Sequence, residues 1–127
     1  SSADKYEEPF KEAAKAHSGA LAVTLNPSAN SNQKRIADLA MRYRWVSICA
    51  RADYADKGNL MAYGPGYTIE GFDGARYLAR ILKGAKPADI PVEQPTKFEM
   101  VINLKTAKQI GASIPPTLLA RADRVIR

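Results

Sequence analysis

Two short apolar runs alternate with stretches of helical period in the first half of the chain. The apolar runs are residues 20–25 and 45–49, and apolar side chains recur at helical spacing over residues 4–17 and 36–43. Strands buried on both faces have short, nearly continuous apolar runs of this kind. A helix between two parallel strands makes a right-handed crossover and covers one face of the sheet. This order predicts an α/β fold, a three-layer sandwich with a parallel sheet.

The middle of the chain predicts a third strand, a third helix and a linker. The strand covers residues 60–63 and is broken by Gly64-Pro65-Gly66, and helical spacing then runs from Ile69 to Leu82. The linker, residues 85–96, carries three prolines, so we expect it to be extended and irregular.

The C-terminal part predicts one more strand and two helices. Residues 98–104 alternate in hydrophobicity, which is the period of a strand packed on one face. A short helix is expected over residues 106–110, ending at Gly111. Pro115-Pro116 precedes a last predicted helix with an apolar stripe made by Leu118, Leu119, Ala122, Val125 and Ile126.

Composition and charge exclude several classes of protein. With 127 residues, 46% of them apolar, the chain is long enough for one domain with a core. No apolar run approaches the ~20 residues that span a bilayer, so we expect no membrane-spanning segment. The net charge of +6 is spread singly along the chain between acidic residues, which argues against nucleic acid as a partner. Cys49 is the only cysteine, which excludes an internal disulfide and a cysteine-based metal site.

Catalytic signatures are weak, so the sequence predicts a protein that is not an enzyme. His17, the only histidine, lies on a helical face rather than beside a nucleophile. The Gly64-Pro65-Gly66 segment lacks the residues of a phosphate-binding loop. Asp53 and Asp56 are close in sequence but belong to a charged loop, where solvation is the simpler interpretation. We expect no metal and no organic cofactor.

Several motifs in a fixed order carry a family resemblance. They are the helical Arg35–Ala40 (RIADLA), Leu60–Pro65 (LMAYGP), Leu82–Asp89 (LKGAKPAD), Pro91–Pro95 (PVEQP) and Ile102–Ala107 (INLKTA). Together they cover about three quarters of the chain, and the stretch from Ile81 to Ile126 is the closest. The chain resembles the C-terminal half of ABC transporter substrate-binding proteins, which have the two-lobed periplasmic-binding-protein type I-like fold.

The resemblance implies a function and a division of the chain. Residues 1–66 would form the second-lobe portion with the cleft loops, and residues 67–127 would return towards the first lobe. The protein would bind a small-molecule solute, such as an amino acid or an aromatic compound, between two lobes and deliver it to ABC permease subunits. It would be periplasmic or otherwise extracytoplasmic, with its signal peptide upstream of this chain. The alternative is a ligand-sensing regulatory domain of the same fold in a transcriptional or signalling protein.

Three loops are candidates for solute contacts, because ligands of open parallel sheets gather at the carboxyl ends of the strands. The first loop is Asn26, Pro27 and Ser28, which could equally be a turn that starts a helix. In the second loop, Arg51 could clamp a carboxylate and Tyr54 could stack on a ring, or Arg51 could be solvated and Tyr54 packed. The third is Tyr63 and Gly64, where Tyr63 could border the cleft or belong to the core. Gly64 and Gly66 would supply the backbone freedom that a hinge needs.

Self-association is a further expectation. If the C-terminal segment normally packs against another lobe, its apolar stripe of Leu118, Leu119, Val125 and Ile126 would lack a partner in this chain. The isolated fragment would then self-associate, by exchanging this segment between copies.

Overall fold

A five-stranded mixed sheet organises the computed structural model, which describes residues 5–65, 67–94 and 96–127. The strands are β1 (Ala20–Val23), β2 (Val46–Cys49), β3 (Met61–Pro65), β4 (Phe98–Asn103) and β5 (Arg124–Ile126), in the spatial order β1-β2-β3-β4-β5. Strands β1, β2 and β3 are parallel. β4 runs antiparallel to β3, and β5 is parallel to β4. The α/β class and a mainly parallel sheet are confirmed.

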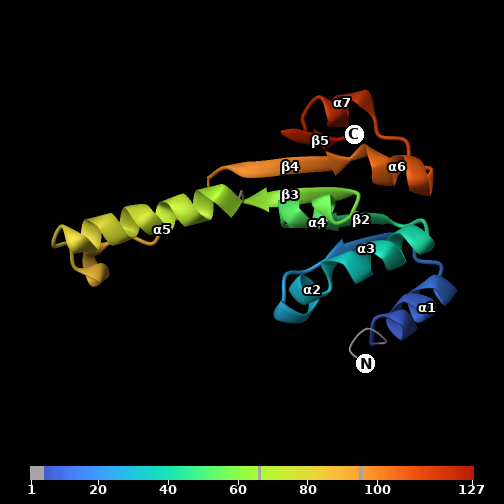
Figure 1. Ribbon diagram of the computed structural model, residues 1–127, viewed down its shortest axis with the longest axis horizontal. Coiled ribbons are helices and arrows are strands. Elements are labelled where there is room, and N and C mark those ends of the chain that lie inside the picture. Colours follow the sequence, from blue (N-terminus) through green and yellow to red (C-terminus); the bar gives the residue numbers. More distant parts are fainter. Residues whose placement is uncertain (1–4, 66, 95) are drawn as a thin grey trace.

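The helices connect these strands in the expected alternation. They are α1 (Glu7–Lys15), α2 (Pro27–Ser31), α3 (Gln33–Arg42), α4 (Ala52–Asp56), α5 (Tyr67–Leu82), α6 (Leu104–Ile110) and α7 (Pro116–Leu119), with a short 3-10 helix at Pro87–Asp89. Figure 1 shows α1, α2 and α3 beside the β1 end of the sheet and α6 and α7 beside β4 and β5. In the same view α5 projects past the end of β3, away from the sheet.

The strand pairing places β4 beside β3 and corrects one expectation for the C-terminal part. β4 forms a ladder with β3 in which Met61 pairs with Ile102 and Pro65 with Phe98. β4 and β5 therefore belong to the same sheet as β1, β2 and β3. The last predicted helix is shorter than expected, because Val125 and Ile126 lie in β5, beside β4. The division of the chain into residues 1–66 and 67–127, with the second part returning towards another lobe, stays a prediction.

Some expected features lie outside the described residues. These are the helix start at Asp4, the hinge role of Gly66 and the proline at position 95. The side chains of residues 67–73, among them Ile69 and Phe72 of the expected third helix, are also outside the described set.

Two core clusters lie beneath α1, α3 and α4, and a third joins Leu60 to Ala107 and Ile110 of α6. Phe10 of α1 stacks on Trp45 with ring centroids 5.3 Å apart, and Ile36 and Leu39 of α3 complete this cluster. Ala55 of α4 packs on Ala62 and Val101 of the neighbouring strands. Small residues at these positions let the short helix lie close to the sheet.

The opposite face of the sheet carries exposed apolar side chains. Val46 is 42% exposed, Ile48 39%, Tyr63 51% and Phe98 50%. The strand registers place all four on one face, because Ile48 is level with Met61 and Pro65 is level with Phe98. Apolar surface of this extent on a folded chain commonly marks a place where something else binds.

Candidate functional site

The carboxyl ends of β1, β2 and β3 lie at one edge of the sheet, and β3 extends furthest. The last pair between β2 and β3 joins Cys49 to Ala62. Tyr63, Gly64 and Pro65 therefore continue past the end of β2 and pair only with β4. Ligands of open α/β sheets bind outside the carboxyl ends of the parallel strands. This edge is the candidate site.

The first candidate loop is a helix start. The side-chain oxygen of Asn26 accepts a hydrogen bond of 2.8 Å from the backbone N–H of Ala29 and so caps α2, and Pro27 occupies the first helical turn. Ser28 Oγ shares a hydrogen bond of 2.7 Å with the hydroxyl of Tyr6. The polar groups of this loop thus have partners within the chain, as expected for a turn that starts a helix. Their contact with a solute stays a prediction.

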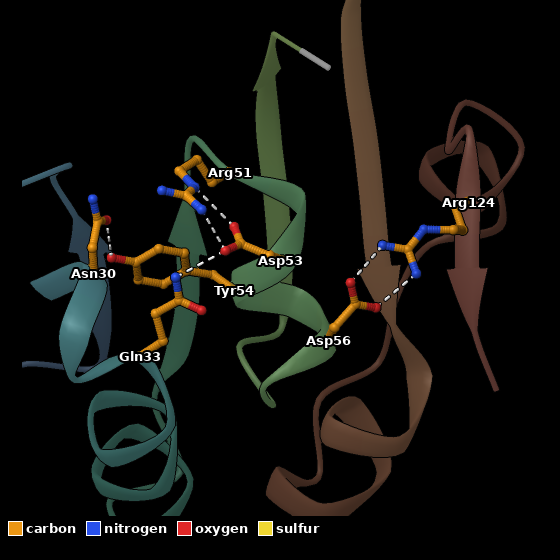
Figure 2. Close-up of polar contacts among 7 residues, drawn as sticks. All are labelled: Asn30, Gln33, Arg51, Asp53, Tyr54, Asp56 and Arg124. Carbon is orange, nitrogen blue, oxygen red and sulfur yellow. Dashed lines mark hydrogen bonds and ion pairs between the residues drawn. The ribbon is translucent and has the colours of Figure 1, made fainter. Parts of the chain in front are cut away.

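The second candidate loop contains a charged cluster that the sequence placed in an irregular loop. Arg51 donates to Asp53 from Nε at 2.9 Å and from Nη2 at 2.6 Å, and Gln33 Nε2 donates to the same carboxylate at 2.9 Å (Figure 2). Partial burial works to raise the pKa of Asp53, but the hydrogen bonds from Gln33 and Arg51, together with the Arg51 charge, outweigh it and lower the pKa below its usual value. Asp53 therefore holds the Arg51 guanidinium in a fixed orientation at the edge.

Tyr54 is a packed residue rather than an exposed stacking ring. It is 0% exposed, and its hydroxyl donates to Asn30 Oδ1 at 2.8 Å. Burial raises the pKa of this hydroxyl. Figure 2 shows the ring lying between α2 and the Arg51–Asp53 pair. The expectation that Tyr54 stacks on a solute is therefore corrected, because its ring has no open face. Its bond to Asn30 instead ties α4 to α2.

The third candidate loop combines an exposed aromatic pair with a close backbone approach. Tyr63 stacks on Phe98 with ring centroids 5.7 Å apart and an interplanar angle of 26°. Gly64 is buried, and a Cβ built on it would lie 1.9 Å from the carbonyl oxygen of Ala50. Only glycine permits this approach. The structure thus gives Gly64 a packing role, whereas its expected hinge role stays a prediction.

A second ion pair fixes α4 on its other side. Arg124 of β5 donates to both carboxylate oxygens of Asp56, at 2.7 Å and 3.0 Å (Figure 2), and the hydrogen bond raises the pKa of Arg124. Beside α4 lies a polar hollow of about 370 Å³. Its lining residues are Asn30, Ser31, Gln33, Lys34, Asp56 and Lys57. Because α4 is tied on both sides, the Arg51 loop has little freedom to move alone.

Residues 5–65, 67–94 and 96–127 hold no cluster of three or more His, Cys, Asp or Glu side chains that could bind a metal ion. In the same ranges no helix is both long and apolar enough to cross a membrane.

Sequence reasoning missed Asn30, Gln33 and Phe98. Asn30 and Gln33 lie in the connection that became α2 and the start of α3, and no spacing within the sequence links them to residues 51–54. Phe98 was assigned to a strand, but its stacking on Tyr63 depends on the antiparallel register of β3 and β4. The side chains of this edge come together only through tertiary contacts.

Comparison with known families decides the classification of the chain. The family model of ABC transporter substrate binding proteins matches residues 9–126. The chain belongs to this family. The family match confirms the resemblance carried by the five sequence motifs.

Solved structures similar to this substrate-binding protein show the same fold. A conserved domain protein from Vibrio cholerae matches with a TM-score of 0.86 at 24% identity, over 97% of this chain. An ABC domain in complex with L-Trp from Streptococcus pneumonia matches with a TM-score of 0.86 at 22% identity, over 98% of this chain. The ligand-free, open structure of a substrate binding protein with adhesive properties from Clostridium difficile gives 0.70 at 18% identity, also over 98%.

The matched regions are only part of the neighbouring chains. The matches cover 41%, 42% and 41% of their chains, respectively. The chain thus spans about two fifths of the length of the structures that it resembles. A comparison with functionally curated proteins gave no match.

Proposed function

We propose that this chain forms one wall of a solute-binding cleft in an ABC importer and that the cleft lies at the carboxyl edge of β1–β3. The observation that carries the proposal is the convergence of three loops on that edge in a chain of this family. The Asn26–Ser28 turn, the Arg51 guanidinium and the Tyr63 ring all come from residues that follow or end a parallel strand. Such edges combine donors from loops with apolar surface.

The solute that this edge supports best is a small molecule such as an amino acid or an aromatic compound. Arg51 would supply positive charge for a carboxylate, and Asp53 holds its guanidinium in place. Tyr63 would supply an apolar ring surface. One structural neighbour is named for its complex with L-Trp, which supports the same class of solute.

The mechanism that fits this arrangement is closure of two lobes about a hinge. β3 and β4 are neighbouring strands, and the chain between them runs out through α5, away from the sheet (Figure 1). A second lobe connected through the segments that follow β3 and precede β4 would move relative to the sheet when those two segments bend. A solute favours closure to the extent that it binds the closed state more tightly than the open one. The closed form would then dock on the permease, outside the cytoplasm.

Calorimetry on the full-length gene product tests this function. Titration with a panel of amino acids and small aromatic acids should give saturable binding with one solute class. Small-angle scattering should show a smaller radius of gyration in the presence of that solute, because the lobes close. If no member of the panel binds and the radius of gyration never changes, the receptor function is contradicted.

A further inference from the structure

Basic side chains that are scattered along the sequence gather at one end of the sheet. This basic end is built by the last turns of α1 and α3, the turn between α4 and β3, and α6. Its exposed Lys and Arg residues are Lys15, Arg42, Arg44, Lys57, Lys105 and Lys108. The segments that form it, residues 15–19, 42–45, 57–60 and 104–111, contain no Asp or Glu. The other 13 of the chain's 19 Lys and Arg residues equal its 13 Asp and Glu residues in number, so the whole net charge of +6 comes from this end.

Contacts between these segments show that they are neighbours. The Val46 N–H donates to the Gly19 carbonyl at 3.3 Å, which joins the segment after α1 to the segment after α3. Thr106 Oγ1 of α6 donates to the Gly58 carbonyl at 2.9 Å, and Met41 at the end of α3 packs on the same cluster as α6. In Figure 1 these elements lie at the end of the sheet away from α5. The basic end is therefore opposite the carboxyl edge of β1–β3, where the candidate site lies.

Most of the charge at the basic end is not used within the chain. Over the described residues, the one ion pair made by the six side chains joins Arg42 Nη1 to Glu7 Oε1 at 3.7 Å, and Glu7 also pairs with Arg35. Arg124, by contrast, contacts both carboxylate oxygens of Asp56 at 2.7 Å and 3.0 Å. The basic end thus differs from other parts of the surface, where Arg and Lys side chains are matched by acidic neighbours.

Two features of the basic end do not favour the stability of the fold. Arg44 has a φ of 56° and His17 a φ of 59°, in the left-handed region that favours glycine. Lys105 lies in the first turn of α6, where the helix dipole disfavours a positive charge. Strained residues of this kind cluster at functional sites. The charge at this end therefore calls for a partner outside the fold.

We propose that the basic end is a docking surface for a membrane that contains anionic phospholipids, so that the receptor rests on the bilayer by the end of this lobe farthest from the solute cleft. The inference rests on the proposed function in one respect, the location of the receptor outside the cytoplasm, where lipid headgroups are the anionic surface that it meets. Each Lys or Arg near such a surface adds to the attraction, which falls off within a Debye length. A plane of headgroups can meet charges from four separate segments at once.

Nucleic acid is the other polyanion that such a surface could bind. Single strands are bound by stacking of bases on exposed aromatic rings, and duplexes are read by a helix or ribbon that enters a groove. The rings of this end, Tyr43 and Trp45, are stacked on each other in the core with centroids 5.1 Å apart. The basic side chains come from four segments rather than from one helix. These observations favour the lipid surface.

Sedimentation of the full-length gene product with lipid vesicles tests the docking surface. Phosphatidylcholine vesicles with about one third phosphatidylglycerol should bind the protein at low salt, vesicles of phosphatidylcholine alone should not, and added NaCl should weaken the binding. The double variant Lys105→Gln/Lys108→Gln should lose roughly ten-fold or more in vesicle affinity, because it removes two charges from the surface. The matched control Lys83→Gln/Lys86→Gln removes two exposed charges with the same spacing, just after α5, and should bind as the wild type does.

Arg44→Gly separates vesicle binding from stability. Glycine favours the left-handed backbone at this position, so the variant should melt at or above the wild-type temperature. Its vesicle affinity should nevertheless fall roughly three-fold or more, because one charge is lost. Thermal melting of the two double variants likewise shows that they are folded before their affinities are compared.

The results that overturn the docking surface are distinct from those that contradict the receptor function. A wild-type protein that does not bind anionic vesicles, or binds neutral ones equally well, overturns the docking surface alone. A folded Lys105→Gln/Lys108→Gln variant with wild-type affinity does the same, as does an equal loss in the control variant. Tighter binding to duplex DNA than to the vesicles at the same salt assigns the basic end to nucleic acid. A protein that binds the vesicles but no solute in calorimetry contradicts only the receptor function.

Discussion

At the scale of single residues, Gly64 is a position where even a methyl group does not fit. Substitution Gly64→Ala would put a methyl group 1.9 Å from the Ala50 carbonyl oxygen, so β3 would have to separate from the Arg51 loop. We expect a loss of about 3 kcal/mol or more in the free energy of unfolding, measured by urea denaturation.

Gly74→Ala is the matched control for this substitution. Gly74 lies inside α5 with nothing within 4 Å of the added Cβ, so alanine should stabilise the helix by about 0.5–1 kcal/mol. Equal effects of the two substitutions would show that the contact with Ala50 has no energetic importance.

Asp53 makes the stability of the chain depend on pH in the acid range. Its pKa is lowered in the folded state, so the unfolded chain binds more protons and stability rises with pH. The stabilisation is complete above the unfolded pKa of about 4 and is lost as pH falls through the lower folded pKa. In Asp53→Asn, the fall of the melting temperature between about pH 5 and pH 2 should be shallower than in the wild type.

Because the Arg51–Asp53 pair is partly solvated, the cost of Asp53→Asn at neutral pH should be modest, about 0.5–1 kcal/mol. Asp89→Asn removes an exposed carboxylate outside the cluster and serves as the control. Melting curves of Asp53→Asn and the wild type that stay parallel at all pH values would contradict this role of Asp53.

At the scale of elements, the junction between β4 and α6 depends on Asn103. Its side-chain oxygen accepts a 3.1 Å hydrogen bond from the Thr106 N–H and caps α6, while its Nδ2 donates to the Ala55 carbonyl at 2.9 Å. Asn103→Ala removes the cap and leaves a buried carbonyl without this donor. We expect a cost of about 2–4 kcal/mol in urea unfolding. Gln109→Ala on the exposed side of α6 should change stability by less than about 0.5 kcal/mol.

Helices and strands with a clear hydrophobic periodicity were predictable from the sequence. Elements that depend on how strands pair were not. α1, β1 and β2 form within the stretches that the apolar pattern indicated, and α3 overlaps its stretch but begins three residues earlier, at Gln33. α4 was missed because five residues are too short to show a helical period. β5 was taken as part of a helix because its three residues have no pattern of their own, and the antiparallel direction of β4 leaves no mark in the sequence.

The position of the candidate loops relative to the sheet was predictable, but the contacts of their residues were not. Parallel strands bring their carboxyl ends to one edge, which placed the Asn26, Arg51 and Tyr63 loops correctly relative to the sheet. Burial of Tyr54 and its bond to Asn30 depend on the contact of α4 with α2, which no local spacing encodes.

At the scale of the whole molecule, the exposed apolar surfaces predict self-association of the isolated chain. The segment first expected to cause it is partly buried in its own chain, since Ile126 packs on the cluster of Ala55, Ala62 and Val101. The open surfaces are instead the sheet face with Ile48 and the side of α5 with Leu78 and Leu82, which are 56% and 78% exposed. Light scattering should give a mass that rises with concentration.

A charge on the open sheet face tests the origin of this association. Ile48→Lys puts a charge on the middle of the face and should shift the chain towards the monomer. Lys57→Ala, on a polar surface beside α4, should not. A monomer at every concentration would contradict the role of these surfaces.

The pairing of Pro65 with Phe98 makes the whole stretch between them equivalent to the turn of a β-hairpin. The sheet requires only that the two ends of this stretch lie side by side. The strand pairing does not depend on the length or the sequence of the residues between them. Residues 66–97 could therefore be shortened, lengthened or exchanged without a change in the register of any strand pair. For the sheet, the stretch between β3 and β4 is therefore an interchangeable loop.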